Sequence, residues 1–140
     1  MIISLGYQRF TNFFEFIRFL KPYKINMLYD LRSIPYSKNY LFNKELLKEK
    51  LAEEGIEYHW CIELGGKYIH TKTQRLAVIK KMPVEGNNIA IMCMENSINA
   101  CHRKEINVLI KEQWGIEVNE VTSKLKIKTD KPKQEQLSLF

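Results

Sequence analysis

The chain of 140 residues lacks any long uninterrupted apolar run. No stretch approaches the roughly 18 apolar residues that a membrane-spanning helix needs. Residues 1–6 also lack the basic region and the long apolar segment of a secretory signal peptide. We therefore expect a protein that works in the cytoplasm and has no membrane partner.

Cysteine is scarce, and its spacing is that of neither a disulfide framework nor a zinc finger. The chain has three cysteines, Cys61, Cys93 and Cys101, without a Cys-x-x-Cys pair. An odd number in a chain large enough to bury its own core indicates thiols. A zinc ion held by Cys93, Cys101 and His102 stays an alternative. No metal and no cofactor is predicted.

The composition is that of one globular domain with a basic extension. Hydrophobic residues make up 45% and charged residues 27%, and the length suits a single core. The net charge is +6, and residues 122–140 contribute five lysines against two acidic residues. We predict one domain over residues 1–121, followed by a basic, flexible and disordered tail over residues 122–140.

Short apolar runs alternate with segments of helical spacing along the domain. Thr11 is the expected cap of the first helix. Alternation of strands and helices predicts a parallel sheet covered on both faces. The expected class is α/β: a single Rossmann-like domain with a mostly parallel sheet of about five strands. The strands are expected at 2–5, 26–31, 56–62, 89–94 and 116–121, and the helices between Thr11 and Pro22 and at 44–54, 73–82 and 102–114.

Polar residues follow most of the expected strands. In open α/β sheets, ligands bind at the carboxyl ends of the strands. We expect the side chains of five charged or titratable residues to approach one common cleft there, namely Asp30, Arg32, Glu95, His102 and Arg103. The strand ends also carry Gly6, Tyr7, Ser37, Glu63, Gly65, Gly66, Cys93 and Cys101.

These residue types suggest a phosphate-using or nucleophilic site. Carboxyl groups act as general acids or bases, thiols and imidazoles as nucleophiles or proton carriers, and guanidinium groups bind phosphate. The predicted catalytic residues are Asp30, Glu95, Cys101 and His102, and the predicted phosphate-binding residues are Arg32, Arg103 and Gly6.

Each of these residues also has an ordinary structural interpretation. Cys93 in a buried strand is either a nucleophile or a small core residue. Asp30 and Arg32 can stabilise a loop through ion pairs, and Glu95 can pair with Arg103. His102 can cap a helix or lie on the surface.

Seven short segments form a specific combination when they are taken together. They are ISLGY at 3–7, DLRSIPYS at 30–37, FN at 42–43, GIEY at 55–58, LGG at 64–66, CME at 93–95 and CHR at 101–103. In this order, over roughly residues 1–121, they resemble the family called domain of unknown function 488 (DUF488). The resemblance implies a compact Rossmann-like domain whose signature is Cys-x-Glu followed by Cys-His-Arg. It implies no particular reaction.

The last five residues, QLSLF, carry a second resemblance. They match at all five positions the peptide by which bacterial polymerases and repair proteins dock on the sliding clamp, the beta subunit of the replicative polymerase. Two leucines and a phenylalanine would anchor such a peptide in a groove. Chance, packing of the tail on its own domain and an oligomer contact are the alternatives. The predicted clamp-binding residues are Gln136, Leu137, Ser138, Leu139 and Phe140.

The clamp-binding tail and the strand-end residues favour a DNA-associated protein recruited to the clamp. We expect an enzyme that processes DNA or a nucleotide component, with base excision and strand cleavage both open. Metal-dependent phosphoryl transfer usually uses more carboxylates than Asp30, Glu63 and Glu95 supply, which favours metal-free chemistry. One alternative is a non-catalytic clamp-bound adaptor or inhibitor that binds nucleotide or phosphate. Another is a small-molecule thiol or sulfur enzyme that uses Cys93 or Cys101.

Overall fold

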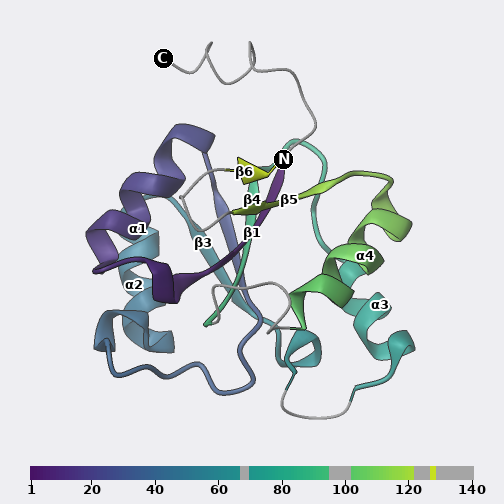
Figure 1. Ribbon diagram of the computed structural model, residues 1–140, viewed down its shortest axis with the longest axis horizontal. Helices are drawn as coiled ribbons and strands as arrows, with labels where there is room; N and C mark the ends of the chain where they lie inside the picture. The colour runs from purple at the N-terminus through teal and green to yellow at the C-terminus, as the bar shows by residue number, and fades with distance from the viewer. Residues whose placement is uncertain (67–69, 95–101, 122–126, 129–140) are drawn as a thin grey trace.

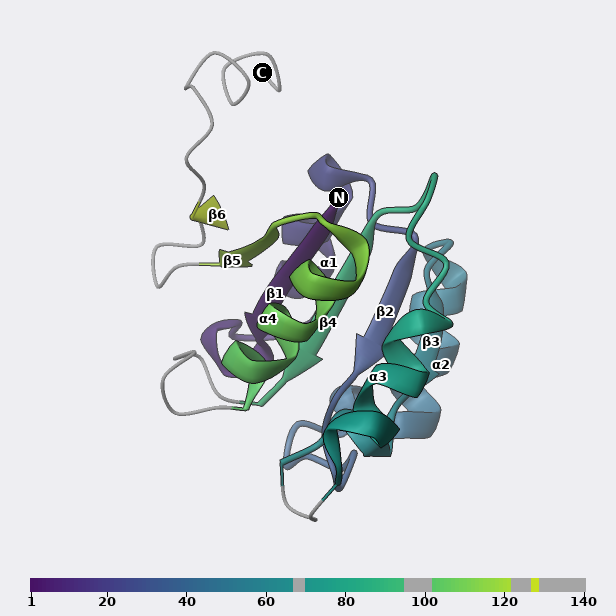
Figure 2. The ribbon, with the colours of Figure 1, turned by 90° about the vertical axis from the view of Figure 1, so that its right-hand side faces the viewer.

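The computed structural model describes residues 1–66, 70–94, 102–121 and 127–128. These residues form one sheet with the strand order β3-β2-β4-β1-β5-β6, and helices cover both of its faces (Figure 1; Figure 2). The first five strands are parallel, so the predicted α/β class is confirmed. The parallel strands are β1 (Ile2–Gly6), β2 (Met27–Asp30), β3 (Glu57–Trp60), β4 (Ile89–Cys93) and β5 (Val118–Val121).

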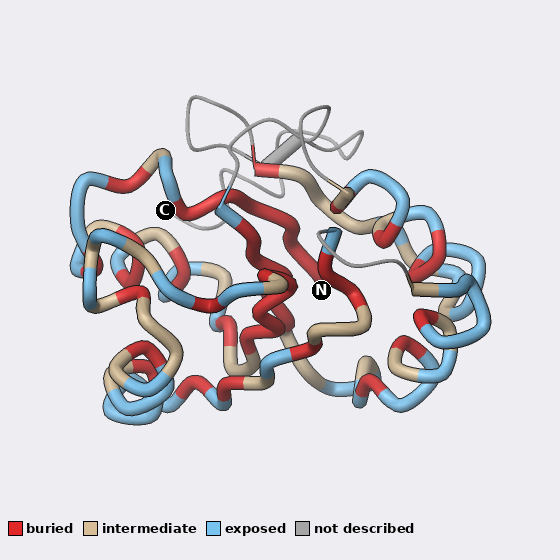
Figure 3. Tube along the Cα trace, turned by 90° about the horizontal axis from the view of Figure 1, so that it is seen from below, coloured by how far each residue is buried: buried red, intermediate tan, exposed pale blue. Residues whose placement is uncertain are grey.

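The four α-helices of the described segments divide into two pairs, one on each side of the sheet. Side chains alternate along each strand, so odd and even positions pack against different pairs. Ile3 and Leu5 of β1 belong to the core cluster under α1 and α2, whereas Ile2 belongs to the cluster under α3 and α4. Figure 3 shows the buried strands between helices whose outer sides are exposed. The helices are α1 (Phe13–Leu20), α2 (Lys44–Glu53), α3 (Lys72–Lys80) and α4 (Arg103–Trp114).

Local sequence signals explain where the helices begin and end. The α1 cap is Asn12 and not the expected Thr11, because the Asn12 side chain accepts a hydrogen bond from the Glu15 backbone N–H at 3.0 Å. Thr71 caps α3 in a reciprocal arrangement with Gln74. Gly115 ends α4 in the left-handed region at φ 68°, a conformation that glycine adopts without strain.

The strand order brings four chain segments to the carboxyl edge of the sheet, at the bottom of Figure 1. β4 lies between β2 and β1. Such an edge is where α/β sheets bind their ligands. The segment between β2 and α2 is long and contains the short helix η3 (Tyr40–Phe42), and η4 (Ile62–Leu64) follows β3.

Within the segment predicted as a tail, Ile127–Lys128 forms β6, which pairs antiparallel with β5. The other residues of that segment, 122–126 and 129–140, lie outside the described residues. The described helices include none that is both long and apolar enough to cross a membrane.

Candidate functional site

Asp30 and Arg32 form a buried ion pair at the carboxyl end of β2. The Arg32 Nε donates to Asp30 Oδ1 at 2.9 Å, and its Nη2 donates to Asp30 Oδ2 at 2.7 Å. The Arg32 backbone N–H also donates to Asp30 Oδ1, at 3.1 Å. The Arg32 side chain is 5% exposed and the Asp30 side chain is 0% exposed. This bidentate contact fixes the plane of the guanidinium group.

Two tyrosines complete the surroundings of this pair. The Tyr58 hydroxyl donates to Asp30 Oδ2 at 2.6 Å, and the Tyr7 ring lies 5.2 Å from the Arg32 guanidinium carbon. Burial raises the pKa of Tyr58, and the charge of Asp30 raises it further. Burial lowers the pKa of Arg32, but the hydrogen bond and the charge of Asp30 outweigh burial, so this pKa is raised. Arg32 is therefore charged and Tyr58 is protonated at neutral pH.

The Arg32 guanidinium group has one nitrogen with no acceptor among the described residues. Its Nε and one Nη2 proton are used by Asp30, and Nη2 also donates to the Phe42 carbonyl oxygen at 2.7 Å. Nη1 is buried and makes no hydrogen bond within the described part of the chain. In this side-on pairing, Nη1 lies on the edge of the guanidinium group that faces away from Asp30. Two donor protons are thus held in a fixed direction.

Two glycines allow three loops to meet at Ser33, the residue that follows Arg32, and at His102. A Cβ built on Gly65 would overlap the Ser33 Oγ, and one on Gly66 would lie 2.8 Å from the His102 Nδ1. The segments after β2, after β3 and before α4 are therefore packed together at these glycines. We call Arg32, Ser33, Gly65, Gly66 and His102 the strand-end site. Within this site Arg32 and Gly65 are buried, whereas Ser33, Gly66 and His102 are partly or fully exposed.

Arg75 of α3 holds the Gly65–Gly66 segment in place. Its Nη2 donates to the Gly65 carbonyl oxygen at 3.2 Å, and its Nη1 contacts Glu105 of α4 at 2.9 Å. The Arg75 side chain is only 9% exposed. Arg75 therefore links α3, α4 and the strand-end site.

Arg103 occupies a different network, at the start of α4. Its Nη1 contacts the Ser4 Oγ at 2.8 Å and the Glu120 Oε2 at 2.6 Å, and its Nε donates to the Cys93 Sγ at 3.0 Å. The side chain is fully buried. Ser4, Cys93 and Glu120 come from β1, β4 and β5, so Arg103 ties three strands to one helix.

The structure does not bring Arg32 and Arg103 into one cleft, contrary to the sequence-based expectation. Asp30 bonds to Tyr58, which belongs to the core cluster under α1 and α2. Arg103 bonds to Cys93, which has the same strand parity as Ile91 of the cluster under α3 and α4. The sheet lies between the two networks. Of the five residues expected to share a cleft, the strand-end site contains Arg32 and His102.

Gly6 ends β1, where it pairs with Cys93 of β4. Its φ of −105° is open to any residue, so its conformation indicates no special role. Its predicted part in phosphate binding is not tested by these contacts.

The two described cysteines, Cys61 and Cys93, are both buried thiols. Burial, with smaller contributions from Glu63 and Asp30, raises the pKa of Cys61 to about 12. Cys61 is thus a thiol and not a thiolate at neutral pH. No three His, Cys, Asp or Glu side chains in the described segments are arranged to hold a metal ion.

Several predicted functional residues lie outside the described residues. They are Glu95, Cys101, Gln136, Leu137, Ser138, Leu139 and Phe140. Their predicted roles remain predictions.

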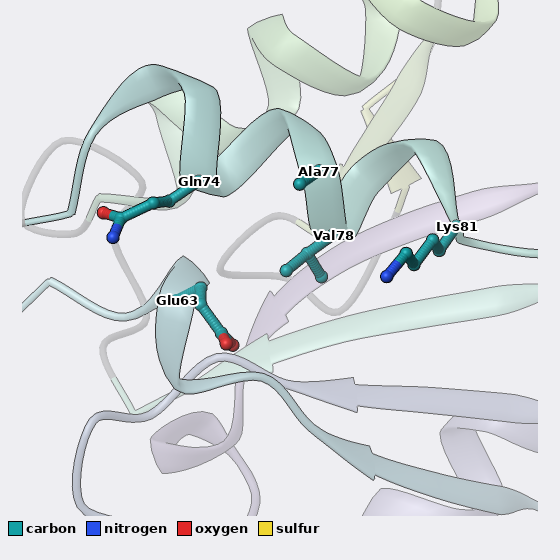
Figure 4. Close-up of a pocket in the computed structure, with 5 residues that line it drawn as sticks. All are labelled: Glu63, Gln74, Ala77, Val78 and Lys81. Atoms are coloured by element: carbon teal, nitrogen blue, oxygen red, sulfur yellow. The ribbon is translucent and has the colours of Figure 1, made fainter.

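A separate hollow of about 290 Å³ lies between η4 and α3 (Figure 4). Its lining residues are Glu63, Gln74, Ala77, Val78 and Lys81. Glu63, which the sequence places at the strand ends, therefore contributes to this hollow and not to the strand-end site.

Sequence reasoning missed three residues that hold other site residues in place. Tyr58 donates to Asp30, Arg75 donates to the Gly65 carbonyl oxygen, and Glu120 accepts from Arg103. Tyr58 and Asp30 lie on neighbouring strands, and Ser4 pairs in register with Glu120. Only the strand order and register reveal these neighbours. Arg75 gave a weak signal, because it is a cation within the buried stripe of a helix.

Comparison with known proteins gives one match. A family model described as Domain of unknown function DUF488 matches residues 12–75. This range includes Asp30, Arg32, Ser33, Gly65 and Gly66, so the predicted resemblance is confirmed over that part of the chain. Neither curated proteins nor solved structures gave a match.

Proposed function

We propose that this chain is a DNA-associated protein that binds a phosphate group of DNA, or of a nucleotide component, at the strand-end site. We further propose that residues 136–140 dock it on the bacterial sliding clamp in the cytoplasm. The binding function is favoured here over the catalytic one, because the described carboxylates near the arginines are already engaged in ion pairs.

The observation that carries the proposal is the buried Nη1 of Arg32, which has no acceptor among the described residues. A buried donor without an acceptor destabilises a protein by about 1–3 kcal/mol. An anion that accepts from Nη1 would remove this penalty and gain a charge-assisted hydrogen bond. Asp30 holds the guanidinium group in place before a ligand binds, so little side-chain entropy is lost on binding.

The neighbours of Arg32 suit a phosphate group. Gly65 and Gly66 have no side chains, so the Ser33 hydroxyl group and the His102 ring can pack closely against their backbone. Ser33 supplies a hydroxyl group, and His102 supplies an imidazole at the start of α4. Ser33, Gly66 and His102 are not buried, so the site is open to a ligand from solvent.

The test compares a deoxynucleoside monophosphate with its nucleoside by calorimetry. We expect binding of the monophosphate only. Arg32→Lys retains the positive charge beside Asp30 but removes the Nη1 donors, and we expect it to weaken binding about tenfold or more. The matched control is Arg18→Lys, at an exposed position of α1. Equal binding of nucleoside and monophosphate would contradict the proposal.

Clamp docking is tested separately, by deleting residues 136–140. We expect loss of binding to a purified bacterial clamp, with Leu139→Ala and Phe140→Ala each causing most of the loss. The thermal midpoint should stay almost unchanged in all three variants. A fall of many degrees would mean that these residues pack on their own domain.

A second candidate function is an enzyme that uses the same site. It is favoured by the partly exposed His102, whose ring lies against Gly66, because imidazole is the side chain that most often transfers protons in enzymes. Incubation with single-stranded, duplex and modified-base DNA tests it. Product formation that is lost in His102→Ala but not in Arg18→Lys would establish this candidate over the binding function.

A further inference from the structure

Four large side chains near the strand-end site are exposed to solvent. Ile34, Tyr36, Tyr40 and Trp60 are 48%, 58%, 64% and 36% exposed, respectively. Three of them belong to the segment between β2 and α2, and Trp60 ends the neighbouring strand β3. We call these four residues and Lys44 the aromatic rim. Grouped exposed apolar side chains of this size indicate an interaction surface.

The backbone that carries the rim is held by its own hydrogen bonds. The Lys44 backbone N–H donates to the Pro35 carbonyl oxygen at 2.9 Å, and the Asn43 N–H donates to the Tyr40 carbonyl oxygen at 3.0 Å. The Asn39 N–H donates to the Ser37 Oγ at 3.1 Å. These hydrogen bonds hold the backbone of the loop, and therefore the positions of its tyrosines, in one arrangement, as in other long functional loops.

Trp60 joins the rim to the strand-end site. Its indole Nε1 donates to the Arg32 backbone carbonyl oxygen at 2.7 Å. The Lys44 Nζ lies 4.2 Å from the centre of the Trp60 ring, within the range of a cation–π contact. A polymer that places one phosphate at Arg32 would therefore have its next units at the aromatic rim.

We propose that the aromatic rim stacks the unpaired bases of a single-stranded nucleic acid, an inference that rests on phosphate binding at the strand-end site. Aromatic faces bind bases without sequence preference, and neighbouring cations follow the backbone. Lys38 and Lys48 are exposed on the same loop and helix, with Glu45 as the one acid between residues 32 and 48. This positive charge favours a nucleic acid over an acidic or neutral protein surface. Duplex DNA hides its base faces, so the rim selects single strands.

The experiment uses the full chain with Trp114→Phe, which leaves Trp60 as the only tryptophan. Trp114 lies at the end of α4, away from the rim, and donates to the Ile79 carbonyl oxygen, so circular dichroism must first show that the variant is folded. We expect an oligothymidylate to quench Trp60 fluorescence, and the same length of duplex to quench it at least tenfold more weakly. Absence of quenching by the single strand, or equal quenching by the duplex, would overturn the proposal.

Two variants assign the stacking to the rim. Tyr36→Ala and Tyr40→Ala should each weaken oligothymidylate binding about fivefold or more, the effect of losing one base–aromatic stack. Val108→Ala is the control, since Val108 is exposed on α4, on the other face of the sheet. Unchanged affinity in both tyrosine variants would overturn the proposal.

Mononucleotide binding separates this inference from the proposed function. Tyr36→Ala and Tyr40→Ala should bind a monophosphate as the unchanged chain does, because the rim is not part of the strand-end site. If the monophosphate binds through Arg32 but the tyrosine variants retain full oligothymidylate affinity, the stacking inference fails and the proposed function stands. If no monophosphate binds, the proposed function fails.

Discussion

Arg32 and Arg103, two of the buried arginines, show how the same residue type serves different purposes on the two faces of one sheet. Arg103 contacts side chains of three strands, and its guanidinium group stabilises the fold from inside. Arg32 contacts one carboxylate and one loop carbonyl, and its Nη1 donors have no acceptor among the described residues. Burial alone therefore does not distinguish a structural arginine from a binding one. The two kinds of arginine are distinguished by the direction in which the remaining guanidinium donors point.

Arg32→Met is the change with the largest expected effect on this comparison. It leaves the fully buried Asp30 with only Tyr58 as a side-chain partner. Loss of one partner of a buried ion pair destabilises a protein by about 3–5 kcal/mol. Urea unfolding at pH 7 measures this loss, with the exposed Arg18→Met as control. A loss below about 1 kcal/mol would show that the pair contributes little.

Arg103→Met should have a smaller effect on stability, about 2–4 kcal/mol. The Glu120 side chain is 16% exposed, so solvent partly compensates its charge after the arginine is removed. The double variant Arg103→Met/Glu120→Gln should recover part of the loss, since it leaves no unpaired charge. Unfolding midpoints of the single and double variants decide this. A double variant less stable than Arg103→Met would contradict the explanation.

Tyr58→Phe removes one hydrogen bond from the Asp30 carboxylate and changes no charge. We expect a loss of about 1–3 kcal/mol, the usual cost when a buried acceptor loses a donor. Phosphate binding should change less than in Arg32→Lys, because the bidentate contact remains. Stability is measured by urea unfolding and binding by calorimetry. Tyr40→Phe, at an exposed ring, is the control.

The smallest expected effect is a fall in stability at alkaline pH. Burial raises the pKa of Cys61 from 9.0 to about 12 and that of Tyr29 from 10.0 to about 12. Above pH 9 the unfolded chain releases these protons before the folded chain does, so unfolding becomes more favourable as pH rises. The ionisation of Cys61 and Tyr29 should leave the free energy of unfolding unchanged below pH 9 and lower it as the pH rises toward 12. Cys61→Ala should make the fall shallower, and an unchanged slope would contradict this assignment.

The alternation of apolar runs and helical spacing was sufficient to predict the fold class. Strand identity needed only local pattern, and Gly55 and Gly115 marked helix ends through their left-handed conformations. The boundaries differ by at most two residues, as expected where caps compete. Asn12 rather than Thr11 caps α1, because its side chain reaches the Glu15 N–H.

The candidate site was predicted less well, and the reason is topological. Strand parity places Asp30 with Leu28 and Cys93 with Ile91, but the sequence does not say which helices cover which face. That choice depends on the direction in which each crossover leaves the sheet. The insertion of β4 between β2 and β1, which sets the neighbours of Asp30 and Arg103, depends on pairing between distant segments.

The position of β1 also has a consequence for the order in which the chain folds. Ile2 pairs with Ile89 of β4 on one side and with Val118 of β5 on the other. β1 is synthesised well before β4 and β5, so it has no partner until residues 89–93 have been made. Sheets that depend on such distant pairing fold slowly. The apolar segment at 2–5 is thus the part of a nascent chain that most needs shielding from other chains during synthesis.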